Sequence, residues 1–173
     1  MSIEKWDVYD VHRNRTGKIV DRGTPHGPGE FHLVVTLCLF DERGRMLIQR
    51  RSDEKELWPG LWDVTVGGSA VAGENSQEAM QRETFEELGI ALDFSRLRPA
   101  FTANYRNGFD DVYVLRHPVA LATLAIPNRE VVAATWATRS EVAELIRAGQ
   151  FLNYRASFID FAWDFIDRTD VFA

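Results

Sequence analysis

The chain has 173 residues, of which 45% are hydrophobic and 27% charged, a composition that indicates one globular domain over residues 1–173 and excludes a disordered or fibrous chain. The formal net charge of −6 argues against a large nucleic-acid partner, which needs clustered positive charge, but it allows a small nucleotide. Cys38 is the single cysteine, so no internal disulfide forms, and a lone thiol fits a reducing compartment.

The sequence shows no feature of a secreted or membrane-spanning protein. The first ten residues lack the basic-then-apolar order of a signal peptide. The longest clean apolar stretch, residues 33–40, is far too short to cross a bilayer. We therefore expect a cytoplasmic protein with no membrane partner.

Periodicity and turn residues predict an α+β domain with a mostly antiparallel or mixed sheet. The first part, residues 1–30, is predicted to be a hairpin followed by a loop rich in glycine and proline. The turn at residues 41–45 predicts that the strands on either side of it pair as a hairpin. We expect strands at residues 6–10, 18–22, 31–40, 45–51, 98–105, 111–116 and 131–137, a short strand after the Pro-Gly turn within 57–68, and helices at 75–88, 139–149 and 157–166.

The helix at residues 75–88 has clear end signals. Asn75 or Ser76 can cap its start, and Glu78 follows Asn75 by three residues, which is the spacing of a capping box. Gly89 is well placed to end the helix.

The end of this helix carries an unusual concentration of negative charge. Glu83, Glu86 and Glu87 lie within five residues, and at 100° per residue they share one face. Like charges at such spacing cost roughly 0.2–0.5 kcal/mol per pair, and the carbonyl end of a helix disfavours anions. Arg82 can hold a carboxylate, and a divalent cation that prefers oxygen ligands would relieve the repulsion. Taken alone, the pattern also fits a solvated charged face, with an apolar stripe elsewhere on Met80, Thr84, Phe85 and Leu88.

The spacing around these glutamates resembles the signature of the Nudix hydrolase family. Five residues separate Gly68 from Glu74, and seven separate Glu74 from Arg82. The positions in register are Gly68, Glu74, Arg82, Glu83, Glu86, Glu87, Gly89 and Ile90. Thr84 departs from the aliphatic residue that the family has after Arg-Glu.

The resemblance implies a fold and a chemistry. The implied fold is an α/β/α sandwich around a mixed β-sheet, in which residues 68–90 form a loop–helix–loop. The implied activity is Mg²⁺- or Mn²⁺-dependent hydrolysis of a nucleoside diphosphate, or another diphosphate, linked to a further group. Carried over by position, Glu83, Glu86, Glu87 and the carbonyl of Gly68 would hold the metal, while Arg82 would orient a carboxylate and Glu74 would support the box.

Two other functions remain open at this point. The segments that flank the box resemble a subgroup close to the isopentenyl-diphosphate isomerases, which use a cysteine and a histidine beside the box. The matching positions here are Gly67 and Ser69, which supply neither, and Cys38 is interpreted as a small buried hydrophobic residue. A non-catalytic diphosphate-binding protein is the other alternative, although such proteins usually have an eroded box.

Residues outside the box are candidates for contact with the substrate. Arg50 or Arg51 can bind phosphate oxygens, and Glu130 or Asp111 can supply a further carboxylate. His32, with His26 in the loop before it, starts the central strand where the isomerases also carry a histidine, and it is interpreted as lining the pocket or lying in the core. The expected partner is a small diphosphate molecule, and the protein is expected to be a monomer or a homodimer.

Overall fold

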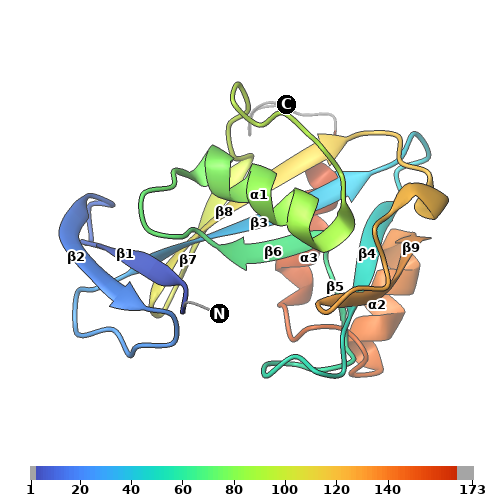
Figure 1. Ribbon diagram of the computed structural model, residues 1–173. Coiled ribbons are helices and arrows are strands. Elements are labelled where there is room, and N and C mark those ends of the chain that lie inside the picture. The colour runs from blue at the N-terminus through green and yellow to red at the C-terminus, as the bar shows by residue number, and fades with distance from the viewer. Residues whose placement is uncertain (1–2, 167–173) are drawn as a thin grey trace.

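The computed structural model describes residues 3–166 as a mixed sheet with helices on both faces (Figure 1). The strands are β1 (Lys5–Tyr9), β2 (Arg15–Asp21), β3 (His32–Phe40), β4 (Met46–Arg51), β5 (Trp62–Asp63), β6 (Val66–Ser69), β7 (Phe101–Tyr105), β8 (Gly108–Arg116) and β9 (Val131–Ala137). The helices are α1 (Ser76–Leu88), a short 3₁₀ turn η1 (Leu121–Thr123), α2 (Arg139–Arg147) and α3 (Ala156–Asp164). The elements expected from sequence are all present, with bounds that differ by a few residues.

The strands of residues 3–166 form two sheets. Strands β1 and β2 form a separate antiparallel hairpin at one end of the molecule (Figure 1). The seven other strands form a mixed sheet in the order β5-β4-β3-β8-β7, in which β6 also pairs with β3 and β9 also pairs with β4. The pairing of β3 with β8 is parallel, and the other pairings are antiparallel. Helix α1 covers one face of this sheet and α3 the other (Figure 1), which confirms the expected α+β class and sandwich.

The hairpin predicted around residues 41–45 is only partly formed. Strands β3 and β4 pair at Phe40 and Met46, next to the turn, and then diverge. The side chain of Thr65 lies between them, where its hydroxyl oxygen accepts from the backbone N–H of Leu39 at 2.8 Å and donates to the carbonyl of Leu47 at 2.6 Å. Strand β4 instead pairs with β9 along its whole length, and β3 pairs with β6. The sequence pattern predicted the turn correctly. It did not predict that β4 pairs mainly with β9, or that β3 pairs with β6.

Alternating side chains of β3 supply the two hydrophobic cores. Leu33, Val35, Leu37 and Leu39 point toward α1 and pack with Met80 and Leu88. Cys38 and Phe40 point to the opposite face, in the core that includes Ile159 and Ala162 of α3. Because side chains alternate between the faces of a strand, β3 reads as a continuous apolar run that is buried on both sides. Within residues 3–166 no helix has the length and apolar character needed to cross a membrane.

Both predicted ends of α1 are confirmed. The side chain of Asn75 accepts from the backbone N–H of Glu78 at 2.9 Å, and the Glu78 carboxylate accepts from the N–H of Asn75 at 2.9 Å, which completes the capping box. Gly89 ends the helix with φ of 73°, in the left-handed region that favours glycine. A Cβ placed on Gly89 would lie 2.6 Å from the Cβ of Ala125, so this glycine is required by contact as well as by conformation.

We predict that Gly89→Ala lowers the free energy of unfolding by about 2–4 kcal/mol, because left-handed strain and overpacking add together. Gly149→Ala is the matched control, since Gly149 also has a positive φ, of 67°, but a Cβ there meets no atom within 4 Å. That variant is expected to lose only about 1–2 kcal/mol. Urea denaturation of both variants measures the difference, and equal losses would contradict the role of the Ala125 contact.

Candidate active site

Glu83, Glu86 and Glu87 of α1 lie in different environments, because one face of the helix packs against the sheet. Glu87 is buried, with 2% of its surface exposed, whereas the side chain of Glu86 is 56% exposed. Glu83 lies between these extremes. The three carboxylates were expected on one face of the helix. They differ, however, in how much of each side chain is exposed to solvent. Phe85, expected on the apolar stripe, is 61% exposed.

Arg82 binds three carboxylates at once. Its Nε and Nη2 donate to the two oxygens of Glu74 at 2.8 and 2.9 Å, a bidentate pair. Its Nη1 donates to Glu83 at 2.9 Å and to Glu86 at 3.0 Å. Nη2 also donates to the carbonyl of Ser69 at 3.1 Å, so the guanidinium ties α1 to the end of β6. Arg82 thus joins Glu74, Glu83 and Glu86 to β6, and a functional role for Arg82 and Glu74 stays a prediction.

The carboxylate of Glu83 lies directly against the backbone of Gly68. A Cβ at Gly68 would overlap all three atoms of that carboxylate group. Gly68 is partly exposed and lies in β6, where Val35 of β3 is its partner. The absence of a side chain at residue 68 therefore lets a charged group from α1 approach the strand, which is the close approach that glycine permits.

Glu87 is the most deeply buried acid of the group. Its carboxylate accepts from Nε2 of Gln49, on β4, at 2.6 Å. Burial, reinforced by the neighbouring charge of Glu83, raises the pKa of Glu87 to about 8, and Glu130 contributes in the same direction. Burial also raises the pKa of Glu83, to which Glu86 and Glu130 add, while Arg82 opposes the shift. Like charges are thus held close together where water cannot screen them well.

Glu130 belongs to this group although it is distant in sequence. It precedes β9, and its side chain accepts from Nζ of Lys55 at 2.5 Å. The carbonyl of Glu130 accepts from the N–H of Ser52 at 2.8 Å, which fixes the two loops together. Lys55 partly offsets the charge that raises the pKa of Glu87. Glu83, Glu130 and Lys55 therefore all lie within electrostatic range of Glu87.

These residues suit a hard divalent cation. Carboxylate and carbonyl oxygens are the ligands that Mg²⁺ and Mn²⁺ prefer, and a cation would relieve the repulsion that raises the pKa of Glu87 and Glu83. One oxygen each of Glu83, Glu86 and Glu87 accepts from Arg82 or Gln49, which leaves a second oxygen for a ligand. Within residues 3–166 no three acidic, histidine or cysteine side chains already form a metal-binding group.

The other predicted site residues lie elsewhere or have other contacts. Asp111 is buried and receives two hydrogen bonds from Nη2 of Arg13, at 3.0 and 2.8 Å, so it holds the β1–β2 hairpin to the sheet. Arg51 donates to Asp63 at 3.2 Å and to the carbonyl of Leu57 at 3.1 Å. Nε of Arg50 donates to the carbonyl of Gly60 at 3.0 Å. A role for these three residues in binding substrate stays a prediction.

Two residues of the site escaped the sequence interpretation. Gln49 is a polar residue in the otherwise apolar start of β4, and this interruption was the available signal. Lys55 lies in a charged loop where nothing in the local pattern distinguishes it. His32 stacks on Trp6 with ring centroids 4.4 Å apart, and its Nε2 lies 2.9 Å from the hydroxyl of Tyr105, so it packs beneath the N-terminal hairpin.

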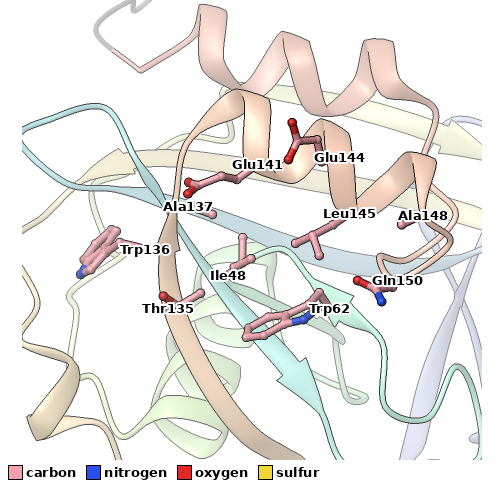
Figure 2. A pocket seen from close by; sticks show the side chains of 10 residues that line it. All are labelled: Ile48, Trp62, Thr135, Trp136, Ala137, Glu141, Glu144, Leu145, Ala148 and Gln150. Atoms are coloured by element: carbon pink, nitrogen blue, oxygen red, sulfur yellow. The ribbon is translucent and has the colours of Figure 1, made fainter.

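A separate surface pocket of about 410 Å³ lies between β9 and α2 (Figure 2). Trp62 and Leu145 line its apolar part, and Glu141 and Glu144 of α2 line it as well (Figure 2). Glu141 is already engaged in the capping box of α2 with Thr138. None of the residues of the glutamate group lines this pocket.

Comparison with known proteins agrees with this geometry. The family model for the NUDIX domain matches residues 30–156. The chain belongs to the Nudix family. It is 42% identical over 152 residues to an uncharacterized Nudix hydrolase of Listeria monocytogenes, a match that covers 88% of this chain and 90% of that protein. It is also 35% identical over 125 residues to an isopentenyl-diphosphate Delta-isomerase of Leifsonia xyli, covering 68% of each chain.

The fold comparison points the same way. The crystal structure of the protein DR0079 from Deinococcus radiodurans superposes with a TM-score of 0.74 at 26% identity, covering 92% of this chain and 97% of that one. This Nudix protein is accordingly a hydrolase that acts on pyrophosphate bonds of small molecules, as predicted, and Nudix enzymes generally use divalent metal ions.

We predict that Gly68→Ala destabilises the protein by about 1–3 kcal/mol, because the added methyl group displaces the Glu83 carboxylate. The matched control is Gly67→Ala on the same strand, where a Cβ meets no atom within 4 Å. The control is expected to change the stability by less than about 1 kcal/mol, in the stabilising direction. Chemical denaturation at neutral pH compares the two, and similar effects would show that the Gly68–Glu83 approach is not constrained.

Proposed function

We propose that the protein is a Mg²⁺- or Mn²⁺-dependent pyrophosphohydrolase. Its substrate would be a nucleoside diphosphate, or a related diphosphate, linked to a further group, and water would attack the phosphoanhydride. The observation that carries this proposal is the position of Glu83, held by Arg82, against Gly68 and within electrostatic range of Glu87 and Glu130. This arrangement would supply oxygen ligands to a divalent cation.

Each residue of the site receives a role from its contacts. Glu83, Glu86, Glu87 and the carbonyl of Gly68 would hold the metal. A bound divalent cation neutralises phosphate oxygens and lowers the pKa of coordinated water. Arg82 would act as a positioning residue, because it fixes Glu83 and Glu86 relative to β6.

The charges around this group would complete the site. Glu130 would serve as a further ligand or as the base, a role for which Glu83 is the other candidate. Lys55 carries a positive charge next to Glu130 and is able to bind an anionic phosphate, as Arg50 or Arg51 would be on release of their present contacts. Catalysis would then rest mainly on positioning and on preorganised charge.

The isomerase alternative lacks its acid in this chain. Gly67 and Ser69 occupy the positions where the resembling isomerases carry cysteine and histidine. Cys38 does not replace them, since it is buried in the core beneath α3 and burial raises the pKa of its thiol far above the usual range. Incorporation of solvent deuterium into isopentenyl diphosphate would favour the isomerase, and tight binding of a diphosphate without turnover would favour a non-catalytic protein.

We predict that Glu83→Gln lowers the hydrolysis rate by roughly 10²–10³, the usual cost of losing one preorganised electrostatic group. The assay follows phosphate release from a panel of nucleoside diphosphates, triphosphates, nucleotide sugars and dinucleotides, each with and without Mg²⁺. Glu78→Gln is the matched control on the same helix, because glutamine also completes a capping box. Unchanged turnover in Glu83→Gln would refute the assigned chemistry.

We also predict that Mg²⁺ stabilises the protein after treatment with a chelator. Binding to the folded state alone should add roughly 2–3 kcal/mol when Mg²⁺ exceeds its Kd by about 100-fold. Thermal melting with increasing Mg²⁺ measures the effect, which Glu83→Gln and Glu87→Gln should diminish and Glu78→Gln should leave intact. An equal Mg²⁺ response in all four proteins would place the metal elsewhere.

A further inference from the structure

The face of the sheet opposite α1 is covered unevenly. Helix α3 packs on the part around Phe101, whose ring lies 5.8 Å from Phe158 and 4.8 Å from Phe161. Closer to the start of β3 the side chains on this face are partly exposed: Val34 on β3, Gly67 and Ser69 on β6, Ala103 on β7 and Asp110 on β8. Most of these residues are small, and we call the surface that they form the floor.

Asp110 is the charged group on this floor. Its Oδ1 is buried, yet it has no hydrogen-bond partner among residues 3–166. Burial raises the pKa of Asp110 to about 6. A hydrogen bond between the Thr36 side chain and this carboxylate opposes the shift, and the charges of Asp111 and Asp63 add to it. A buried carboxylate oxygen without a donor costs free energy, so such an atom needs an explanation.

The neighbouring residue shows what a purely structural aspartate looks like here. Asp111 points to the opposite face and is satisfied by Arg13 and by the hydroxyl of Thr102, which donates at 2.6 Å. The two adjacent carboxylates thus differ in a way that the strand alternation alone explains: one is saturated, and the other presents an acceptor to a partly exposed surface.

Strand register fixes the position of Asp110 relative to Ser69, which lies next to the proposed catalytic group. Val34 of β3 pairs with Ser69 on one side and with Asp110 on the other. Asp110 therefore lies two strand spacings from Ser69, about 10 Å. Ser69 follows Gly68, whose backbone meets Glu83 on the opposite face. Gly67 has no side chain, and a Cβ there would meet no atom within 4 Å. Near Gly67, therefore, only the backbone of β6 separates the floor from the face on which Glu83 lies.

We propose that Asp110 accepts a hydrogen bond from the organic group attached to the substrate's diphosphate, which lies on this floor while the diphosphate reaches the carboxylates of α1. The inference rests on the proposed function and deepens it. The group must carry an N–H or O–H donor, as a nucleoside does. A hydrocarbon chain would leave Oδ1 of Asp110 buried and unpaired, and is therefore disfavoured.

The test uses probes that cannot be hydrolysed, so that it does not depend on turnover. Isothermal titration calorimetry in the presence of Mg²⁺ compares methylenediphosphonate, adenosine 5′-(α,β-methylene)diphosphate and a prenyl methylenediphosphonate. We expect the wild-type chain to bind the nucleoside probe at least about tenfold more tightly than the other two. Asp110→Leu should remove that advantage, with binding of methylenediphosphonate unchanged within about twofold. Asp110→Asn, which keeps the shape, should reduce the advantage severalfold.

Asp93→Asn is the control, because Asp93 is an exposed aspartate outside the sheet. Thermal melting verifies that each variant is folded. The inference is wrong if Asp110→Leu and Asp110→Asn keep the full nucleoside advantage, if they weaken all three probes equally, or if the wild type prefers the prenyl probe or shows no preference. Failure of the proposed function has a different signature: neither methylenediphosphonate binding nor phosphate release would then respond to Glu83→Gln.

Discussion

The structure of the active-site region depends on how a dense group of carboxylates is kept together. Arg82 is central, because a single guanidinium binds Glu74, Glu83 and Glu86 and also the carbonyl at the end of β6. A lysine in its place would offer one point charge instead of a planar set of donors, so it would not fix the same geometry. Arg82 does not contact Glu87 or Glu130. Gln49 donates a hydrogen bond to Glu87, and Lys55 forms an ion pair with Glu130.

The division of the sheet explains how these groups meet. Because Thr65 separates β3 from β4, β4 turns toward β9 and carries Gln49 to Glu87. The same separation leaves β6 beside β3, with Gly68 facing α1. One buried hydroxyl, satisfied as donor and acceptor, thus sets the relation between the two halves of the sheet. A regular β3–β4 hairpin would have no place for β6.

The N-terminal hairpin supports the same region from outside. The backbone N–H of Ala72 donates to the carbonyl of Lys5 at 2.7 Å, and that of Gly73 donates to Asp7 at 2.8 Å. Arg15 donates to the carbonyl of Glu74 at 2.5 Å. The loop that leads from Gly68 to α1 is therefore held at three points before Glu74 engages Arg82. Arg13, in turn, fastens the hairpin to Asp111.

The sequence by itself determined what depends on neighbouring residues: the strands and helices, the caps of α1 at Asn75 and Gly89, and the spacing from Gly68 to Glu87 that identified the family. Only the tertiary structure decided that Glu87 is buried while Glu86 is exposed, that Glu130 and Lys55 join the glutamates, and that Asp110 and Asp111 face different surroundings. The physical reason is that helix caps and periodicity are local, whereas burial and charge proximity follow from strand register between segments far apart in the chain.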